Sequence, residues 1–113
     1  AGVNVVGESY GDSYFEDIDT FVNRTLRHGD HEGETFNPEE GVDRVVALKL
    51  FTYRSAEFLY GESRVGSLEV GKYADFIVTD KPFLSGPDED IRNNKVVLNV
   101  IAGETAYRDS DYR

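Results

Sequence analysis

The stretch "GSLEVGKYADFIVTD" (residues 66–80) is the most informative part of this chain for its fold. Glycine punctuates it, and the pair Gly71-Lys72 predicts a turn that reverses the chain. The small side chain of Ala74 permits close approach of a neighbouring strand. Asp75 can pin the turn, because a carboxylate accepts hydrogen bonds from nearby backbone N–H groups.

This turn is followed by a predicted strand, then by a loop that contains Pro82 and Pro87, and then by two further predicted strands. Phe76 and Val78 alternate with Ile77, so we expect a strand at 74–79. Further apolar runs predict strands at 95–101 and 104–108, joined by a tight turn at Ala102-Gly103. Between the strands at 74–79 and 95–101, "PDEDIRN" (87–93) has proline at its start and acids in its first turn, which predicts one turn of helix.

Upstream of residue 66 the apolar period changes to that of helices. Asp43 is a suitable N-cap for a helix over 44–60, whose apolar stripe consists of Val45, Leu48, Thr52, Ser55 and Leu59, widened by Ala47, Phe51 and Phe58. An earlier helix is predicted from Asp17 or Asp19 to His28.

The first residues complete the expected order of elements. Residues 3–6 (Val-Asn-Val-Val) read as a short buried strand, and the polar residues 30–41 read as a loop. Strand, helix and helix followed by several strands predict a fold between α/β and α+β.

Residues 66–107 closely resemble the C-terminal signature of the amidohydrolase superfamily, a group of metal-dependent hydrolases. The residues that carry this resemblance are Gly66, Ser67, Leu68, Gly71, Lys72, Ala74, Asp75, Phe76, Ile77, Val78 and Gly103. The stretches "FNPEEGVDRVVALKLFT" and "PDEDIRNNKV" are most similar to the amidohydrolase 3 branch, which includes YtcJ-like and AepA-like proteins.

The resemblance implies a definite fold and domain division. Residues 1–61 would be the last strand and helices of a (β/α)8 metal-dependent hydrolase barrel (a TIM barrel), with 30–41 as a loop. Residues 62–113 would supply strands of the accessory composite β-sandwich. The chain would then be a C-terminal fragment, and the parent reaction would be hydrolysis of non-peptide C–N bonds with a divalent metal such as zinc.

Two residues near the start are candidates for chemistry. "GESYG" (7–11) has the G-x-S-x-G form of a serine-hydrolase elbow, with Ser9 as its nucleophile. A turn residue is the better interpretation, because no histidine follows far enough along the chain to act as the base. In the resembling family this loop carries a catalytic Asp, and Asp12 is the candidate for it.

His28 and His31 are weak candidates for metal ligands. They lie three residues apart among Asp30, Glu32 and Glu34, and imidazole with carboxylate suits zinc. However, neighbouring glycines indicate a flexible loop, which favours solvated histidines. The family's His-x-His, lysine and later histidines do not occur in this sequence, so we expect no metal to be bound by this chain alone.

The charge distribution limits the partners. The net charge is −10, and residues 1–43 hold 11 acids but only two bases. This acidity disfavours nucleic acid and indicates a solvated acidic surface or, alternatively, a cation site. No apolar run approaches the ~20 residues that span a bilayer. Residues 1–7 lack the basic start of a signal peptide, which favours a cytoplasmic over a secreted location.

Two functional classes remain open. The chain is either part of an amidohydrolase or a stand-alone, non-catalytic module that associates with itself, and catalysis by Ser9 is a remote third. The expected partners are the remainder of an amidohydrolase polypeptide or a second copy, which predicts a homo-oligomer.

Overall fold

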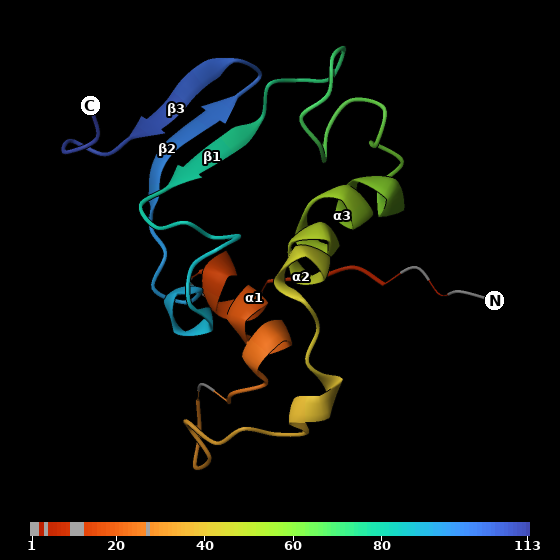
Figure 1. Ribbon diagram of the computed structural model, residues 1–113. Helices are drawn as coiled ribbons and strands as arrows, with labels where there is room; N and C mark the ends of the chain where they lie inside the picture. Colours follow the sequence, from red (N-terminus) through yellow and green to blue (C-terminus); the bar gives the residue numbers. More distant parts are fainter. Residues whose placement is uncertain (1–2, 4, 10–12, 27) are drawn as a thin grey trace.

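The computed structural model describes residues 3, 5–9, 13–26 and 28–113, and Figure 1 shows helices in the first half of the chain and strands in the second. The helical elements are α1 (Tyr14–Asn23), η1 (Pro38–Glu40), α2 (Arg44–Phe51) and α3 (Tyr53–Phe58). The later elements are β1 (Phe76–Thr79), η2 (Asp88–Asp90), β2 (Val96–Ile101) and β3 (Glu104–Arg108). The expected mixture of helices and sheet is therefore present.

The sheet agrees closely with the sequence prediction. Its strands run antiparallel in the order β1-β2-β3. Ala102 and Gly103 have φ angles of 52° and 83°, which suit the two-residue turn between β2 and β3. Asp75 stabilises the turn between β2 and β3, and not the preceding turn at Gly71-Lys72 as predicted, since its Oδ1 accepts a hydrogen bond from the Ala102 N–H at 2.6 Å. The Gly103 N–H donates to the Ala74 carbonyl at 3.1 Å, so the end of one strand fixes the hairpin of the other two.

Helix α1 begins and ends earlier than predicted. Ser13 is its N-cap, neither Asp17 nor Asp19, and it stops at Arg24, which adopts a left-handed φ of 54°. The prediction was wrong because Asp19 lies inside the helix with its side chain turned inward. The left-handed residue then redirects the chain into a small hairpin four residues before His28.

The single helix predicted over 44–60 is in fact two helices. Asp43 caps α2 as expected, because its carboxylate accepts from the Val45 N–H at 2.7 Å. The helix breaks at Thr52, whose hydroxyl donates to the Leu48 carbonyl at 2.8 Å, while the Ser55 hydroxyl donates to the Leu50 carbonyl at 2.7 Å. These hydroxyls compete for carbonyls that a continuous helix would use.

The predicted apolar stripe and the first strand are also corrected. Val45, Phe58 and Leu59 are 41%, 61% and 74% exposed, contrary to the prediction. Ala47, which was predicted to widen the stripe, is buried, and so is Ala56, which was not part of it. In the stretch 3–6, the described residues Val3, Val5 and Val6 belong to no strand.

The core is small and joins three segments that are distant in sequence. Ile18 of α1, Ala47 of α2 and Ile91, which follows η2, are buried together. The half-buried side chains around them are Phe21, Val22, Val42, Phe51 and Phe83. This cluster fixes the two helices and the η2 segment relative to one another.

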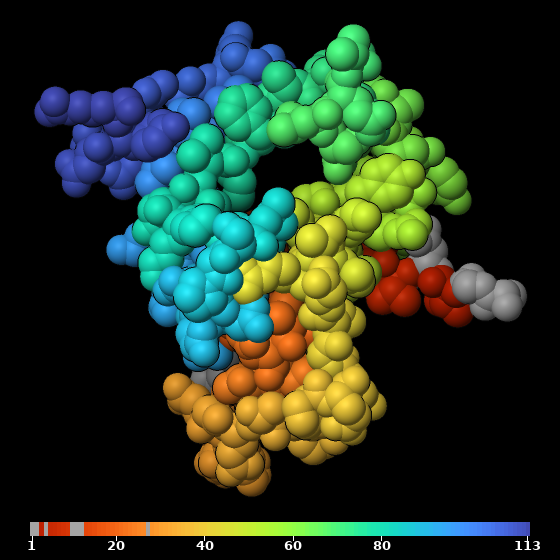
Figure 2. Space-filling view, in the orientation of Figure 1, coloured from red at the N-terminus to blue at the C-terminus, as the bar shows by residue number. Residues whose placement is uncertain are grey.

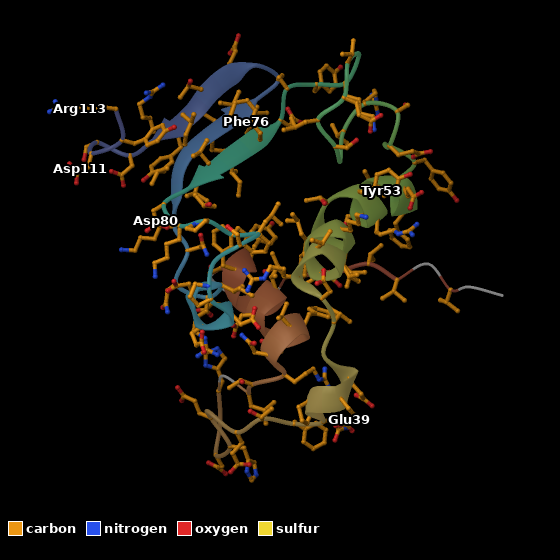
Figure 3. The ribbon with its side chains drawn as sticks, in the orientation of Figure 1. Glu39, Tyr53, Phe76, Asp80, Asp111 and Arg113 are labelled. Carbon is orange, nitrogen blue, oxygen red and sulfur yellow. The ribbon has the colours of Figure 1, made fainter. Side chains whose placement is uncertain are left out.

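The connection between β1 and β2, residues 80–95, runs from the sheet to the helices and back; we call it the excursion. It leaves at Asp80, labelled in Figure 3, and returns at Lys95, where the Asp80 N–H donates to the Lys95 carbonyl at 3.0 Å. Within it, the Phe83 ring lies 6.2 Å from that of Phe15 in α1. Elsewhere the sheet stands apart, and Figure 2 shows an opening between β1, the green 62–75 segment and α3.

Replacing Phe51 by alanine should lower the free energy of unfolding by about 2 kcal/mol, less than the ~3–5 kcal/mol typical of fully buried phenylalanines. The ring is half-buried, lies edge-on to Phe21 at 5.7 Å and to Tyr14 at 6.5 Å, and covers Gly7. Urea unfolding measures the loss. The exposed ring of Phe58 is the control, and equal losses in the two alanine variants would contradict this packing.

Candidate functional site

Residues 5–9, which precede the predicted catalytic carboxylate in the sequence, are held against the helices. Asp12 itself lies outside the described residues. The Gly7 N–H donates to the Leu50 carbonyl at 3.0 Å, and the Phe51 ring sits so close that a Cβ on Gly7 would lie 2.6 Å from it. These contacts place residues 5–9 beside the end of α2.

Ser9 is paired with a carboxylate. Its hydroxyl donates to Asp17 in the first turn of α1, and this is the side-chain hydrogen bond that the described structure gives it. A serine nucleophile needs an imidazole or another base to take its proton. The Ser9–Asp17 bond ties Ser9 to the first turn of α1.

The two histidines lie on a hairpin described by residues 24–26 and 28–36. Backbone bonds close it, from the Leu26 N–H to the Glu34 carbonyl at 2.9 Å and from the Phe36 N–H to the Arg24 carbonyl at 2.8 Å. His31 Nδ1 lies 3.2 Å from the Glu34 carboxylate, and both side chains are about two thirds exposed, at 69% and 67%. Residues 30–41 are therefore more ordered than the predicted loop, and they also include η1, where Figure 3 labels Glu39.

The side chains of the described residues do not fit a resident metal ion. Across 3, 5–9, 13–26 and 28–113, no three His, Asp or Glu side chains come together at ligand distance. A reactive zinc site has three protein ligands and an open position for water. His28 and His31 thus remain exposed side chains of the hairpin, without a third ligand in the described structure.

Among the described residues, the most thoroughly buried polar side chain is that of Asp19, whose burial the sequence prediction missed. Its side chain is 1% exposed, and Oδ2 accepts from Arg92 Nε at 3.1 Å and Nη2 at 2.8 Å. The Asn23 amide donates to Oδ1 at 2.6 Å. A signal for this site existed, since Asp19 falls on the same helix face as Phe15 and Ile18, where an acid is expected only if it has a partner.

A cluster of polar bonds around η2 extends this pairing. Arg44 of α2 donates through Nη1 to the Phe83 carbonyl at 2.7 Å, and its Nη2 pairs with Asp88. The Asn23 amide also donates to the Asp88 carbonyl at 3.2 Å. We call these residues, with Asp19 and Arg92, the η2 clamp, because they hold that turn between α1 and α2.

An open cavity of about 490 Å³ lies beside the clamp, lined by Asp19, Asn23, Thr25, Thr35, Asp88, Glu89, Arg92 and Asn93. Every residue that lines it has a polar or charged side chain, whereas small-molecule pockets are lined mostly by hydrophobic and aromatic residues with a few polar groups. Asp19, Asp88 and Arg92 already have partners within the chain. The cavity is therefore an open recess beside the clamp, and no hydrogen bond between a hydroxyl and a base is seen among its lining residues.

The family-like turn at 66–72 is held by a second ion-paired network. Lys72 Nζ lies 2.6 Å from the Ser67 hydroxyl and 3.0 Å from the Glu69 carboxylate. Hydrogen bonds from Ser67 and Lys72, and the charge of Lys72, lower the pKa of Glu69. On the neighbouring α3, where Figure 3 labels Tyr53, a hydrogen bond to Glu57 raises the pKa of the tyrosine. Because Glu69 neutralises Lys72, this lysine acts as a structural cation here.

Two comparisons place this architecture among known proteins. The model of the amidohydrolase family, branch 3, matches residues 12–107. The crystal structure of an amidohydrolase from Thermotoga maritima MSB8 superposes with a TM-score of 0.58 at 22% sequence identity, covering 84% of this chain and 19% of that chain. No curated protein matches the chain significantly.

Since the family model covers most of its residues, the chain belongs to the amidohydrolase family, in its branch 3. This confirms the resemblance seen in residues 66–107. The structural likeness supports the fold, and the chain corresponds to about a fifth of the length of the matched structure. In the part of the chain that the structure describes, no helix is long and apolar enough to cross a membrane.

Proposed function

We propose that this chain is the C-terminal structural portion of an amidohydrolase whose complete form hydrolyses non-peptide C–N bonds. The observation that carries the proposal is the match of residues 12–107 to the family, together with a span of only 19% of a solved amidohydrolase. The chain would supply helices and an antiparallel hairpin that support a site built mainly by other residues of the polypeptide.

The proposed division follows the change from helices to strands. Residues 1–61 would complete a (β/α)8 barrel, and residues 62–113 would contribute to a composite β-sandwich beside it. Helices α1 to α3 and the sheet β1-β2-β3 are consistent with these roles. The opening between the sheet and α3 in Figure 2 would be filled by other parts of the enzyme.

In the complete enzyme, Asp12 would be the contribution of this chain to chemistry. It precedes α1 in the loop whose neighbouring residues 5–9 lie beside the end of α2. A carboxylate there would accept the proton of the attacking water as a general base. A divalent metal such as zinc, which the family implies, would need ligands from outside the described residues.

We expect the isolated chain to be catalytically inert. Purified chain supplemented with zinc should not hydrolyse N-acyl amino acids or cyclic amides above background, because the described residues assemble no three-ligand site. The measurement is product formation against a metal-only blank. Turnover that survives repurification and disappears in Asp12→Ala would overturn the claim that the chain is inert, while leaving family membership intact.

A self-associating module is the second candidate, favoured by the amount of exposed apolar surface. The most exposed apolar side chains of the described structure include Val3, Leu59, Tyr60, Leu68 and Val70, each at least 70% accessible. The outer edge of β1 is also unpaired, since this strand pairs only with β2 among the described elements. Edge β3 is better protected, because Ala106 forms a bulge in it and charged residues stand at both of its ends.

Light scattering at micromolar concentration should therefore give a mass above that of one chain. Ile77→Lys places a charge on β1 at a side chain that is 49% exposed, and should shift the mass towards one chain. Thr105→Lys makes the same kind of change on β3 and should leave the mass unchanged. A single-chain mass for the unmodified protein, with unfolding independent of concentration, would exclude this second candidate.

A further inference from the structure

We draw no further inference here: the strongest candidate, the unpaired edge of β1 with the exposed apolar side chains Ile77, Ile101 and Tyr107 on one face of the sheet, carries nothing because nothing in the described structure shows what covers it.

Discussion

Replacing Asp19 by alanine is expected to lower the free energy of unfolding by about 3 kcal/mol. The carboxylate is 1% exposed and satisfies both Arg92 and Asn23. Its loss takes the carboxylate away from the Arg92 guanidinium, leaves the Asn23 amide only its bond to the Asp88 carbonyl, and opens space beneath α1. The expected loss is at the lower end for buried ion pairs because Arg92 is 40% exposed and can recover some hydration. A gain of a few tenths of a kcal/mol in helix propensity offsets part of it.

Asp17→Ala is the matched control, because it makes the same chemical change in the same helix. Asp17 is only half-buried and pairs with the Ser9 hydroxyl, so about 1 kcal/mol is expected. Denaturant unfolding of both variants, and of Arg92→Ala alone and with Asp19→Ala, gives the coupling between the two partners. Equal losses for Asp17 and Asp19, or no coupling with Arg92, would mean that the pair does not hold α1 to the η2 segment.

Gly66→Ala should lower the free energy of unfolding by about 3 kcal/mol, because backbone strain and steric overlap add together. Gly66 has a φ of +92°, which L side chains rarely adopt. A Cβ there would lie 2.5 Å from the Cβ of Ala56 and 3.3 Å from the Thr52 carbonyl oxygen. Both neighbours belong to the α3 region, so the 62–75 segment would have to move away from the helix.

Gly71→Ala separates these two effects. Gly71 has nearly the same φ, +95°, but nothing lies within 4 Å of its added Cβ. Only the backbone strain remains, and about 1 kcal/mol is expected. Thermal or urea unfolding of the two variants measures the difference. If Gly71→Ala proves as destabilising as Gly66→Ala, the close packing of the segment on Ala56 is wrong.

The sheet was predictable because its signals are local. Alternation at Phe76, Ile77 and Val78 and the Ala102-Gly103 turn each depend on neighbours in sequence, and both appear in the structure. The turn of helix in 87–93 is likewise present as η2, with proline at its N-cap. The periodicity and turn chemistry of such segments determine them before any tertiary contact is made.

The helix boundaries and the η2 clamp were not predictable, because side-chain partners far away in sequence determine them. Asp19 was interpreted as a cap, yet its partner Arg92 stands 73 residues later. The break at Thr52 depends on which backbone carbonyls accept hydrogen bonds from the Thr52 and Ser55 hydroxyls, and the spacing of apolar residues carries no information about this. The metal-site prediction shows the same limit: proximity of His28 and His31 in sequence does not reveal whether a third ligand lies beside them, and none does among the described residues.

The crossing of residues 80–95 from the sheet to the helices makes the two halves of the chain inseparable. A polypeptide that stopped at Gly61 would contain all three α-helices but would lack Ile91 and Arg92, and with them part of the core and the partner of the buried Asp19. Exchanging the second half between related proteins would meet the same difficulty, since the incoming excursion must match the helices of the recipient. Recombination within this family should therefore respect the pairing of α1 with residues 88–92, and change both together.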